Sequence, residues 1–136
     1  MIRATLLFAV LSVTCSMFPA RAQAQCTRCC GAQGFWTSLA VTPTSAEEGQ
    51  PVSITIGVSS CFSTTKVFTA TVRIIPTASA CSSFAEEFSV SGTVFAREHR
   101  IFTHTFPAPK CDSTYDVTME SVSTMNFVPT VTLTVE

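Results

Sequence analysis

The stretch Val52-Ser53-Ile54-Thr55-Ile56-Gly57-Val58-Ser59 decides the fold class of this 136-residue chain. Its apolar residues stand at every second position, and the residues between them are serine, threonine or glycine. Successive side chains of a β-strand point to opposite faces of a sheet, so a period of two is typical of a strand with one buried and one solvated face. The apolar face needs a second layer, and the stretch therefore predicts a sheet packed against a partner.

The same alternation recurs along the rest of the chain, between short turns rich in proline, glycine and polar residues. It is present in residues 37–42, 68–74, 88–94, 101–106, 115–119 and 131–135. No segment shows a sustained helical period of apolar residues, so no helix is predicted. Seven short strands, spaced by about 8–12 residues, are typical of a β-sandwich. We therefore predict an all-β domain over residues 37–136.

Three stretches resemble the immunoglobulin-like or fibronectin-III-like modules of bacterial exported, adhesion-related proteins. They are Gly49-Gln50-Pro51-Val52-Ser53-Ile54-Thr55-Ile56, Phe102-Thr103-His104-Thr105-Phe106-Pro107-Ala108-Pro109 and Ser113-Thr114-Tyr115-Asp116-Val117. In that family a Gly-Gln-Pro turn leads into the second strand, a Thr/Phe strand ends in Ala-Pro, and a Tyr begins the sixth strand. The resemblance covers roughly residues 39–136. It implies a seven-stranded immunoglobulin-like antiparallel β-sandwich with a passive binding or spacing role. The cysteines, which the family usually lacks, are a departure.

The first residues have the features of a secretory signal peptide. Arg3 precedes an apolar run over residues 6–13, and Ala20-Arg21-Ala22 and Ala22-Gln23-Ala24 both fit a cleavage site. The run is shorter than the roughly 20 apolar residues of a membrane span. We predict a cleaved signal peptide over residues 1–24, a Cys-rich segment over residues 25–36, and a secreted or periplasmic protein without a membrane span.

Charge and motifs point away from several function classes. The formal net charge is −1, so the chain lacks the basic footprint of a nucleic-acid-binding domain, and no nucleic-acid partner is expected. No nucleophile elbow, zinc-protease helix or phosphate-cradling glycine loop is present in the sequence. We therefore expect a non-catalytic module without a cofactor, whose partner is a protein or a glycan that the sequence does not name.

Six cysteines follow the predicted signal peptide, and an even number in a small exported chain predicts a disulfide framework. If the strands alternate in direction, the loops that carry Cys81 and Cys111 share one end of the sandwich, whereas Cys61 shares the other end with the N-terminal cluster. Bridged Cα atoms lie within about 7 Å, so same-end pairing is favoured. We predict Cys81–Cys111, Cys61 with one cluster member, and a bridge between the remaining two. The cluster is Cys26, Cys29 and Cys30.

Two other functions compete with a structural role for these features. Cys26-Thr27-Arg28-Cys29 is a Cys-x-x-Cys motif, and Arg28 beside it can lower a thiol pKa, which suggests thiol redox chemistry or a metal site. Redox motifs of that kind belong where a strand meets a helix in an α/β fold, so we prefer structural bridges. The eleven phenylalanines suggest a third possibility, a sandwich that holds a lipid between its sheets.

Five further side chains stand out. Tyr115 is a candidate tyrosine corner, in which the hydroxyl returns to nearby backbone. Phe35 and Trp36 form either a hydrophobic plug, which we prefer, or an exposed aromatic anchor for a partner. His99 and His104 are five residues apart, so on one strand they face opposite sides and do not form a metal-binding pair. His104 is expected to be a core or edge histidine.

Overall fold

The computed structural model describes residue 29 and residues 31–136. The chain divides into two compact units, Met1–Ala32 and Gln33–Glu136, and the second is a β-sandwich. The predicted signal peptide lies outside the described residues. Within the part of the chain that is described, no helix is long and apolar enough to cross a membrane.

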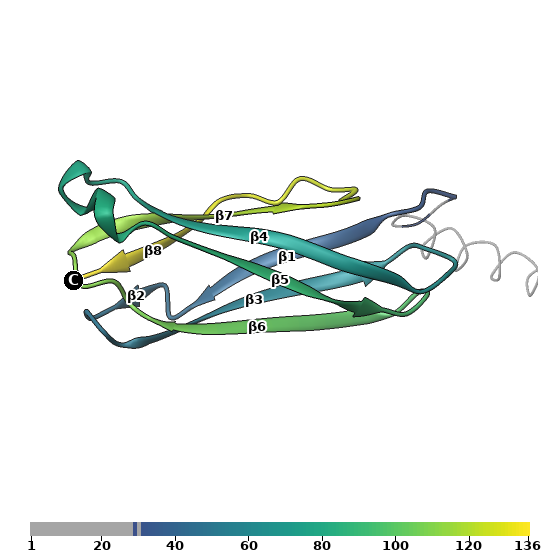
Figure 1. The fold of residues 1–136 in the computed structure, drawn as a ribbon, viewed down its shortest axis with the longest axis horizontal. Helices are drawn as coiled ribbons and strands as arrows, with labels where there is room; N and C mark the ends of the chain where they lie inside the picture. Colours follow the sequence, from purple (N-terminus) through teal and green to yellow (C-terminus); the bar gives the residue numbers. More distant parts are fainter. Residues whose placement is uncertain (1–28, 30) are drawn as a thin grey trace, which may run out of the picture. The chain divides into compact units, whose positions relative to one another are not determined.

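The sandwich contains eight strands and one short 3-10 helix. In chain order they are β1 (Phe35–Thr42), β2 (Ser45–Ala46), β3 (Pro51–Ser60), β4 (Lys66–Pro76), η1 (Ser79–Phe84), β5 (Glu86–Val94), β6 (His99–Pro107), β7 (Ser113–Ser121) and β8 (Val131–Val135). One sheet has the order β1-β3-β6 and the other the order β2-β8-β7-β4-β5, and the two form separate layers (Figure 1). The all-β prediction is confirmed.

The predicted count of seven strands, all antiparallel, is wrong by one strand. Pro43 follows the last residue of β1, and the chain then leaves the first sheet to join the second. Ser45–Ala46 pairs in parallel with β8, and Thr134 N–H donates to the Thr44 carbonyl at 2.8 Å. A two-residue strand is too short to show an alternation in the sequence. The helix η1 was not predicted either, because one 3-10 turn carries no apolar period.

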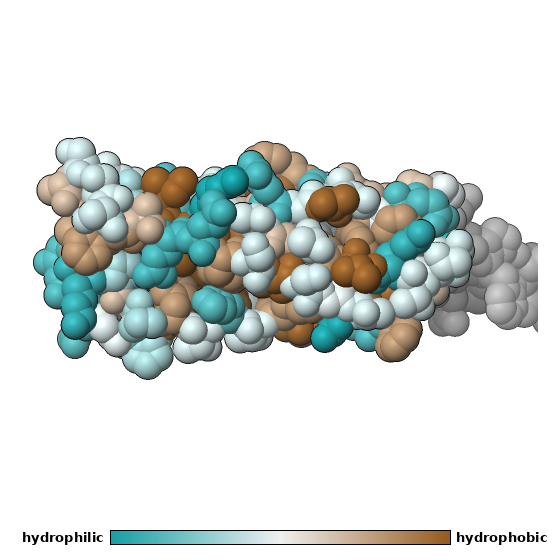
Figure 2. All heavy atoms as spheres, in the orientation of Figure 1, coloured by the Kyte–Doolittle hydropathy of each residue, from teal (hydrophilic) through white to brown (hydrophobic). Residues whose placement is uncertain are grey.

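The core lies where the alternation places it. Val52, Ile54, Ile56 and Val58 of β3 are at most 1% exposed, and their neighbours Ser53, Thr55 and Ser59 are more accessible. Phe68, Ala70, Val72 and Ile74 of β4 face them from the other sheet as members of the same buried cluster. Burial of apolar surface contributes about 25 cal/mol per Å², so this interdigitated layer supplies most of the driving force for folding. On the surface, hydrophobic residues appear as separate spots among hydrophilic ones (Figure 2).

The side of the sandwich between β1 and β8, called the β1–β8 side, is closed by main chain. Residues 123–126 of the β7–β8 loop run along the edge of β1. Phe35 N–H donates to the Ser123 carbonyl, and Met125 N–H donates to the Phe35 carbonyl, both at 2.8 Å. The Asn126 amide continues this ladder: it accepts from Thr37 N–H at 2.9 Å and donates to the Thr37 carbonyl at 2.8 Å. One side-chain amide thus takes the place of a backbone peptide group.

The opposite side, between β5 and β6, is closed by side chains. The His104 ring stacks on Phe88 with centroids 3.9 Å apart. Farther along, the Arg100 guanidinium lies 4.6 Å from the Phe102 ring centroid, and its Nη1 donates to the Thr93 carbonyl at 2.5 Å. A Cβ at Gly92 would lie 2.5 Å from the Phe102 ring, so only glycine permits this contact. We call this the β5–β6 side; its strands converge at a short connection at the right of Figure 1.

Candidate functional site

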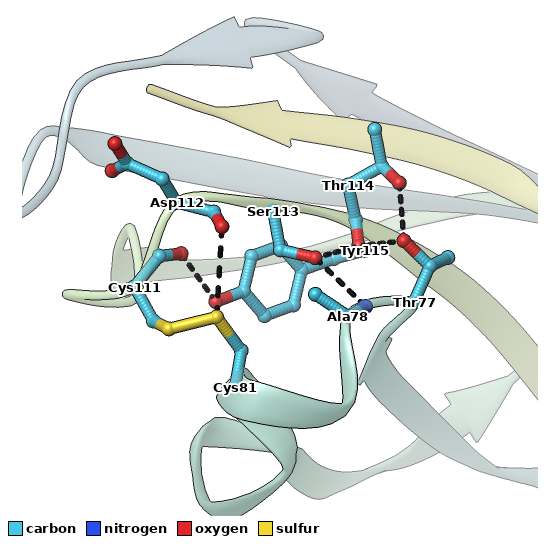
Figure 3. The surroundings of a disulfide bond; sticks show 8 residues. All are labelled: Thr77, Ala78, Cys81, Cys111, Asp112, Ser113, Thr114 and Tyr115. Atoms are coloured by element: carbon cyan, nitrogen blue, oxygen red, sulfur yellow. Dashed lines mark hydrogen bonds between the residues drawn. A yellow bond between two sulfur atoms is a disulfide. The ribbon is translucent and has the colours of Figure 1, made fainter.

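A disulfide and a buried tyrosine fix one end of the sandwich (Figure 3). Cys81 is the buried residue of η1, and it bonds Cys111 in the β6–β7 connection with Cα atoms 5.8 Å apart. This is the pair that the strand directions predicted. Cys81 lies in the connection from β4 to β5, and Cys111 lies in the connection from β6 to β7. The bond therefore joins these two connections at one end of the β5–β6 side.

Tyr115 holds the same connection from inside. Its ring is fully buried, and its hydroxyl donates to the Cys111 carbonyl at 2.7 Å, which is the hydrogen bond of a tyrosine corner. Burial, followed by the negative charges of Glu48, Asp112 and Glu86, raises the pKa of Tyr115, so the phenol stays protonated and remains a donor. Its partner is backbone, which supports a structural role over ligand binding.

Two threonines join η1 to the start of β7. Thr77 N–H donates to the Thr114 carbonyl at 2.9 Å, and the two threonine hydroxyls are 2.6 Å apart. Ala78 N–H donates to Ser113 Oγ at 3.2 Å. These bonds position the turn independently of the disulfide and orient Cys81 toward Cys111 (Figure 3).

The described N-terminal cysteine carries no free thiol. Cys29 is disulfide-bonded, and so is Cys61, which is fully buried. Cys26 and Cys30 lie outside the described residues. In residues 29 and 31–136, no three His, Cys, Asp or Glu side chains are grouped as metal ligands.

Phe35 is a core residue, as expected of the preferred hydrophobic plug and not of an exposed anchor. It lies in β1, is 2% exposed, and meets the Phe62 and Phe68 rings edge-on at 5.0 and 5.2 Å. Phe68 in turn contacts Phe102 at 5.7 Å. The phenylalanines that suggested a lipid cavity here pack on one another. The sandwich also begins before residue 37, because Phe35 and Trp36 belong to its first strand.

Trp36 lies on the opposite face of β1, which is the outer face of the three-stranded sheet. It is half-buried, and the register aligns it with Ser59 and His99 in one cross-strand row. A 2.7 Å hydrogen bond joins Ser59 Oγ to His99 Nδ1. Next to this row, Gly57 leaves room for Ser38, whose Oγ would lie 2.5 Å from a Cβ at that position. The result is a shallow platform of one indole, one imidazole and two hydroxyls.

The rest of this outer face has the same uncharged chemistry. Ser53 and Thr105 hydroxyls are hydrogen-bonded across β3 and β6 at 3.1 Å. Within the described strands, the outward positions of this sheet carry no Asp, Glu, Lys or Arg. They are Trp36, Ser38, Ala40 and Thr42 on β1, Ser53, Thr55, Gly57 and Ser59 on β3, and His99, Ile101, Thr103 and Thr105 on β6.

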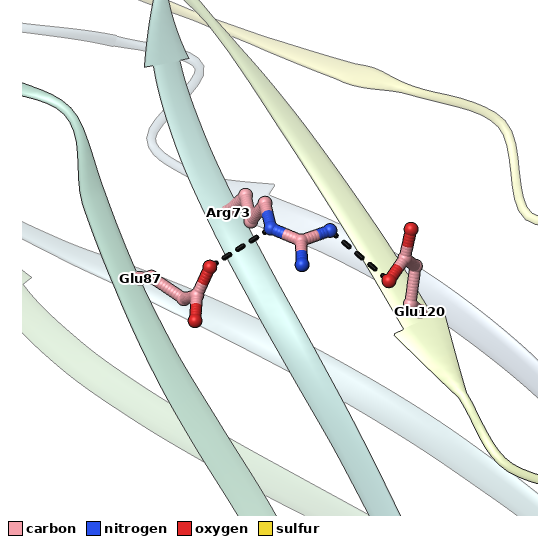
Figure 4. Close-up of polar contacts among 3 residues, drawn as sticks. All are labelled: Arg73, Glu87 and Glu120. Carbon is pink, nitrogen blue, oxygen red and sulfur yellow. Dashed lines mark hydrogen bonds and ion pairs between the residues drawn. The ribbon is translucent and has the colours of Figure 1, made fainter.

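The outer face of the five-stranded sheet is charged instead. Arg73 on β4 lies between Glu87 on β5 and Glu120 on β7 (Figure 4). Its Nε is 2.8 Å from the first carboxylate and its Nη1 is 3.0 Å from the second. Both carboxylates raise the pKa of Arg73 through hydrogen bonds and charge. The pairs are solvent-exposed, so water and salt screen them and each contributes little to stability.

The two histidines lie on different faces. His99 is on the outer face, whereas His104 points toward β5 and stacks on Phe88. They do not share a site, as their odd spacing predicted. His104 is half-buried at the β5–β6 side, which agrees with its expected position as an edge histidine.

Comparison with known proteins adds the fold but no family. No family model matches the chain, and no curated protein matches it. Among solved structures, a CARDB domain from Pyrococcus furiosus in complex with di-metal ions has a TM-score of 0.53 at 12% identity, over 76% of this chain and 93% of that one. The same domain in solution also scores 0.53, at 11% identity over 75% and 94%.

A larger structure shares the fold over part of its length. The Pseudomonas fluorescens alkylpurine DNA glycosylase AlkC, bound to DNA containing an abasic site analog, has a TM-score of 0.62 at 11% identity over 76% of this chain. The chain spans only 31% of the glycosylase. At these identities the likeness concerns the fold alone, which is a sandwich of the kind predicted.

Proposed function

We propose that this protein is an exported, non-catalytic binding module that contacts a neutral glycan through the outer face of the β1-β3-β6 sheet. The observation that carries the proposal is the uncharged platform around Trp36, Ser59 and His99. The immunoglobulin-like sandwich serves as a rigid support, stabilised by disulfides, and the module is secreted or periplasmic.

The disulfides support export. Cys81–Cys111 is formed, and Cys29 and Cys61 are each bonded. Such bonds persist in oxidising compartments and are rare in the cytosol. The predicted signal peptide over residues 1–24 leads to the same location.

The chemistry of the platform favours a glycan over a protein. A neutral sugar presents hydroxyl groups beside patches of C–H bonds. The sugar hydroxyls can hydrogen-bond to the hydroxyls of Ser38 and Ser59 and to the imidazole of His99. The C–H patches can pack on the amphipathic indole of Trp36. Protein interfaces are instead depleted in serine and enriched in aromatic, methionine and arginine side chains, and of these the platform has only Trp36. The two outward rows that contain Thr55 and Ser53 extend the same surface.

The test is binding to an array of neutral manno-, xylo- and gluco-oligosaccharides, followed by calorimetry on any sugar that binds. Thr55→Lys places a charge on the platform side, and Thr71→Lys is its matched control on β4, at an outward position of the other sheet. We expect T55K and Trp36→Ala to weaken binding at least tenfold and T71K to leave it unchanged. Absence of binding to every sugar, or loss of binding in T71K alone, would contradict the proposal.

A further inference from the structure

One edge of the β5 strand has no strand paired with it among residues 29 and 31–136. The β1 edge is covered by residues 123–126, and β8 is flanked by β2. β5 lies at the end of its sheet, next to β4 on one side only. Its nine residues pair with β4 without interruption, so the strand contains no bulge.

Two hydrogen bonds show which main-chain groups of β5 face this edge. Thr93 offers its carbonyl to Arg100 of β6, so that carbonyl points away from β4. The Thr69 carbonyl of β4 accepts from Val122 N–H at 3.3 Å, so the main-chain groups of Thr69 point away from β5. Ser91 is the β5 residue opposite Thr69, so the main-chain groups of Ser91 point away from β4. In an antiparallel pair these directions alternate with every residue. Glu87, Ser89, Ser91 and Thr93 therefore present their N–H and carbonyl groups to the edge.

Most of this edge lacks the devices that prevent strands from pairing. Edge strands are usually guarded by lysine, proline, bulges or a covering segment. β5 contains neither lysine nor proline. Arg100 occupies the carbonyl of Thr93, but over the described residues no hydrogen bond reaches the main chain of Ser89 or Ser91 from that side. Glu86 and Glu87 place charges at the other end, so only the middle of the strand, around Ser89 and Ser91, is unguarded.

Apolar side chains lie along the same side. Phe88 and Val90 of β5 and Phe102 of β6 are only partly buried, although each packs against the core. A strand added beside β5 would cover them further. Unpaired main-chain groups and partly exposed apolar side chains thus lie together along the edge of β5.

We propose that β5 pairs antiparallel with β5 of a second copy of this chain, which extends the five-stranded sheet across a two-fold axis. The register centred on Ser89 places Ser89 opposite itself and Glu87 opposite Ser91, and leaves Arg100 and Thr93 undisturbed. No like charges face each other, because Glu87 lies opposite Ser91, and Arg73 of the same chain pairs with Glu87. The axis makes the contact self-complementary and closed, so it ends at a dimer. This goes beyond the proposed glycan contact, which uses the other sheet.

A mass measurement over concentration tests the pairing. In sedimentation velocity from ~1 µM to ~1 mM, we expect wild-type protein to reach twice the monomer mass at the high end. Ser91→Pro removes an N–H that faces the edge and no N–H of the ladder to β4, so we expect its dissociation constant to rise at least tenfold. Thr103→Pro is the matched change on the β6 edge and leaves the dimer intact. A wild-type monomer at every concentration would overturn the proposal, and so would a dimer lost in T103P but kept in S91P.

A cross-link tests the register without relying on proline. Ser89→Cys places two thiols opposite each other, with Cα atoms about 5.5 Å apart, within reach of a disulfide. Ser91→Cys is the control, because residue 91 lies opposite residue 87 of the second copy. Under mild oxidation we expect S89C to form covalent dimers at least tenfold faster than S91C. Equal rates, or faster cross-linking of S91C, would overturn the register.

Discussion

The two lateral sides of this sandwich are closed by different means. On the β1–β8 side, the loop at residues 123–126 and the strand β2 satisfy main-chain groups directly. On the β5–β6 side, rings and one guanidinium fill the gap; the Cys81–Cys111 disulfide holds one end, and the short chain connection from β5 to β6 closes the other. Side chains between the sheets close the β5–β6 side, but Ser89 and Ser91 of β5 stay exposed and their main-chain groups stay unpaired within the described residues. Such an edge is available to another strand.

Removal of the disulfide at the end of the β5–β6 side has the largest expected effect. The bond closes a separation of 30 residues, so Cys81→Ala with Cys111→Ala should lower the free energy of unfolding by about 3 kcal/mol. Denaturant unfolding of the double variant measures the loss. A variant as stable as wild type would contradict this difference between the two sides, because the β5–β6 side would then need no covalent link.

The second prediction tests the β1–β8 side. Asn126→Ala leaves Thr37 N–H and its carbonyl without their partners, and we expect a loss of about 2 kcal/mol in the same assay. Phe127→Ala is the neighbouring control, because Phe127 is 86% exposed and should cost little. Equal effects of the two changes would show that the loop is not held through Asn126.

A smaller loss is expected for the stacked pair on the β5–β6 side. Phe88→Ala should lower the free energy of unfolding by about 1 kcal/mol, because the ring is only half-buried. A double-mutant cycle with His104→Ala isolates the ring contact, for which we expect a coupling of about 0.5–1.5 kcal/mol. Additive effects would mean that the 3.9 Å stack contributes nothing.

Thr37 gives a prediction of opposite sign. Its backbone is held by Asn126, but its Oγ1 is buried and has no hydrogen-bond partner among the residues that the structure describes. Thr37→Val removes that unsatisfied group at similar volume, so we expect a gain of up to about 1 kcal/mol. Thr37→Ser keeps the hydroxyl and serves as the control. A less stable T37V would show that the hydroxyl does have a partner.

The smallest effect concerns pH at the disulfide end. Hydrogen bonding to Asp112, then burial, then the Asp112 charge raise the pKa of Glu48 above its ordinary value of 4.5, and Lys110 opposes this. A raised pKa in the folded state means that stability falls as pH rises through it. Glu48→Gln should therefore raise Tm slightly at neutral pH and leave it unchanged near pH ~3. A Tm difference that grows toward acid pH would contradict this sign.

Much of the fold could be predicted from the apolar alternation of the strands and from the positions of the loops. The inward residues of β3 and β4 and the Cys81–Cys111 bond follow from side-chain period and strand direction. The alternation of Thr37, Leu39 and Val41 also extends back to Phe35, a signal that would have placed this residue in the core. Asn126 gave no such signal, because its partner Thr37 is 89 residues away. The crossing to β2 and the platform at Trp36 likewise depend on pairing that local patterns do not contain.

Amide hydrogen exchange tests the difference between the two sides most directly. At low protein concentration, we predict strong protection for the N–H groups of Phe35 and Thr37 and fast exchange for those of Ser89 and Ser91. As concentration rises toward ~1 mM, Ser89 and Ser91 should become protected while Phe35 and Thr37 stay unchanged. Protection of Ser89 and Ser91 already in the dilute monomer would contradict the account, because the β5 edge would then be covered within a single chain.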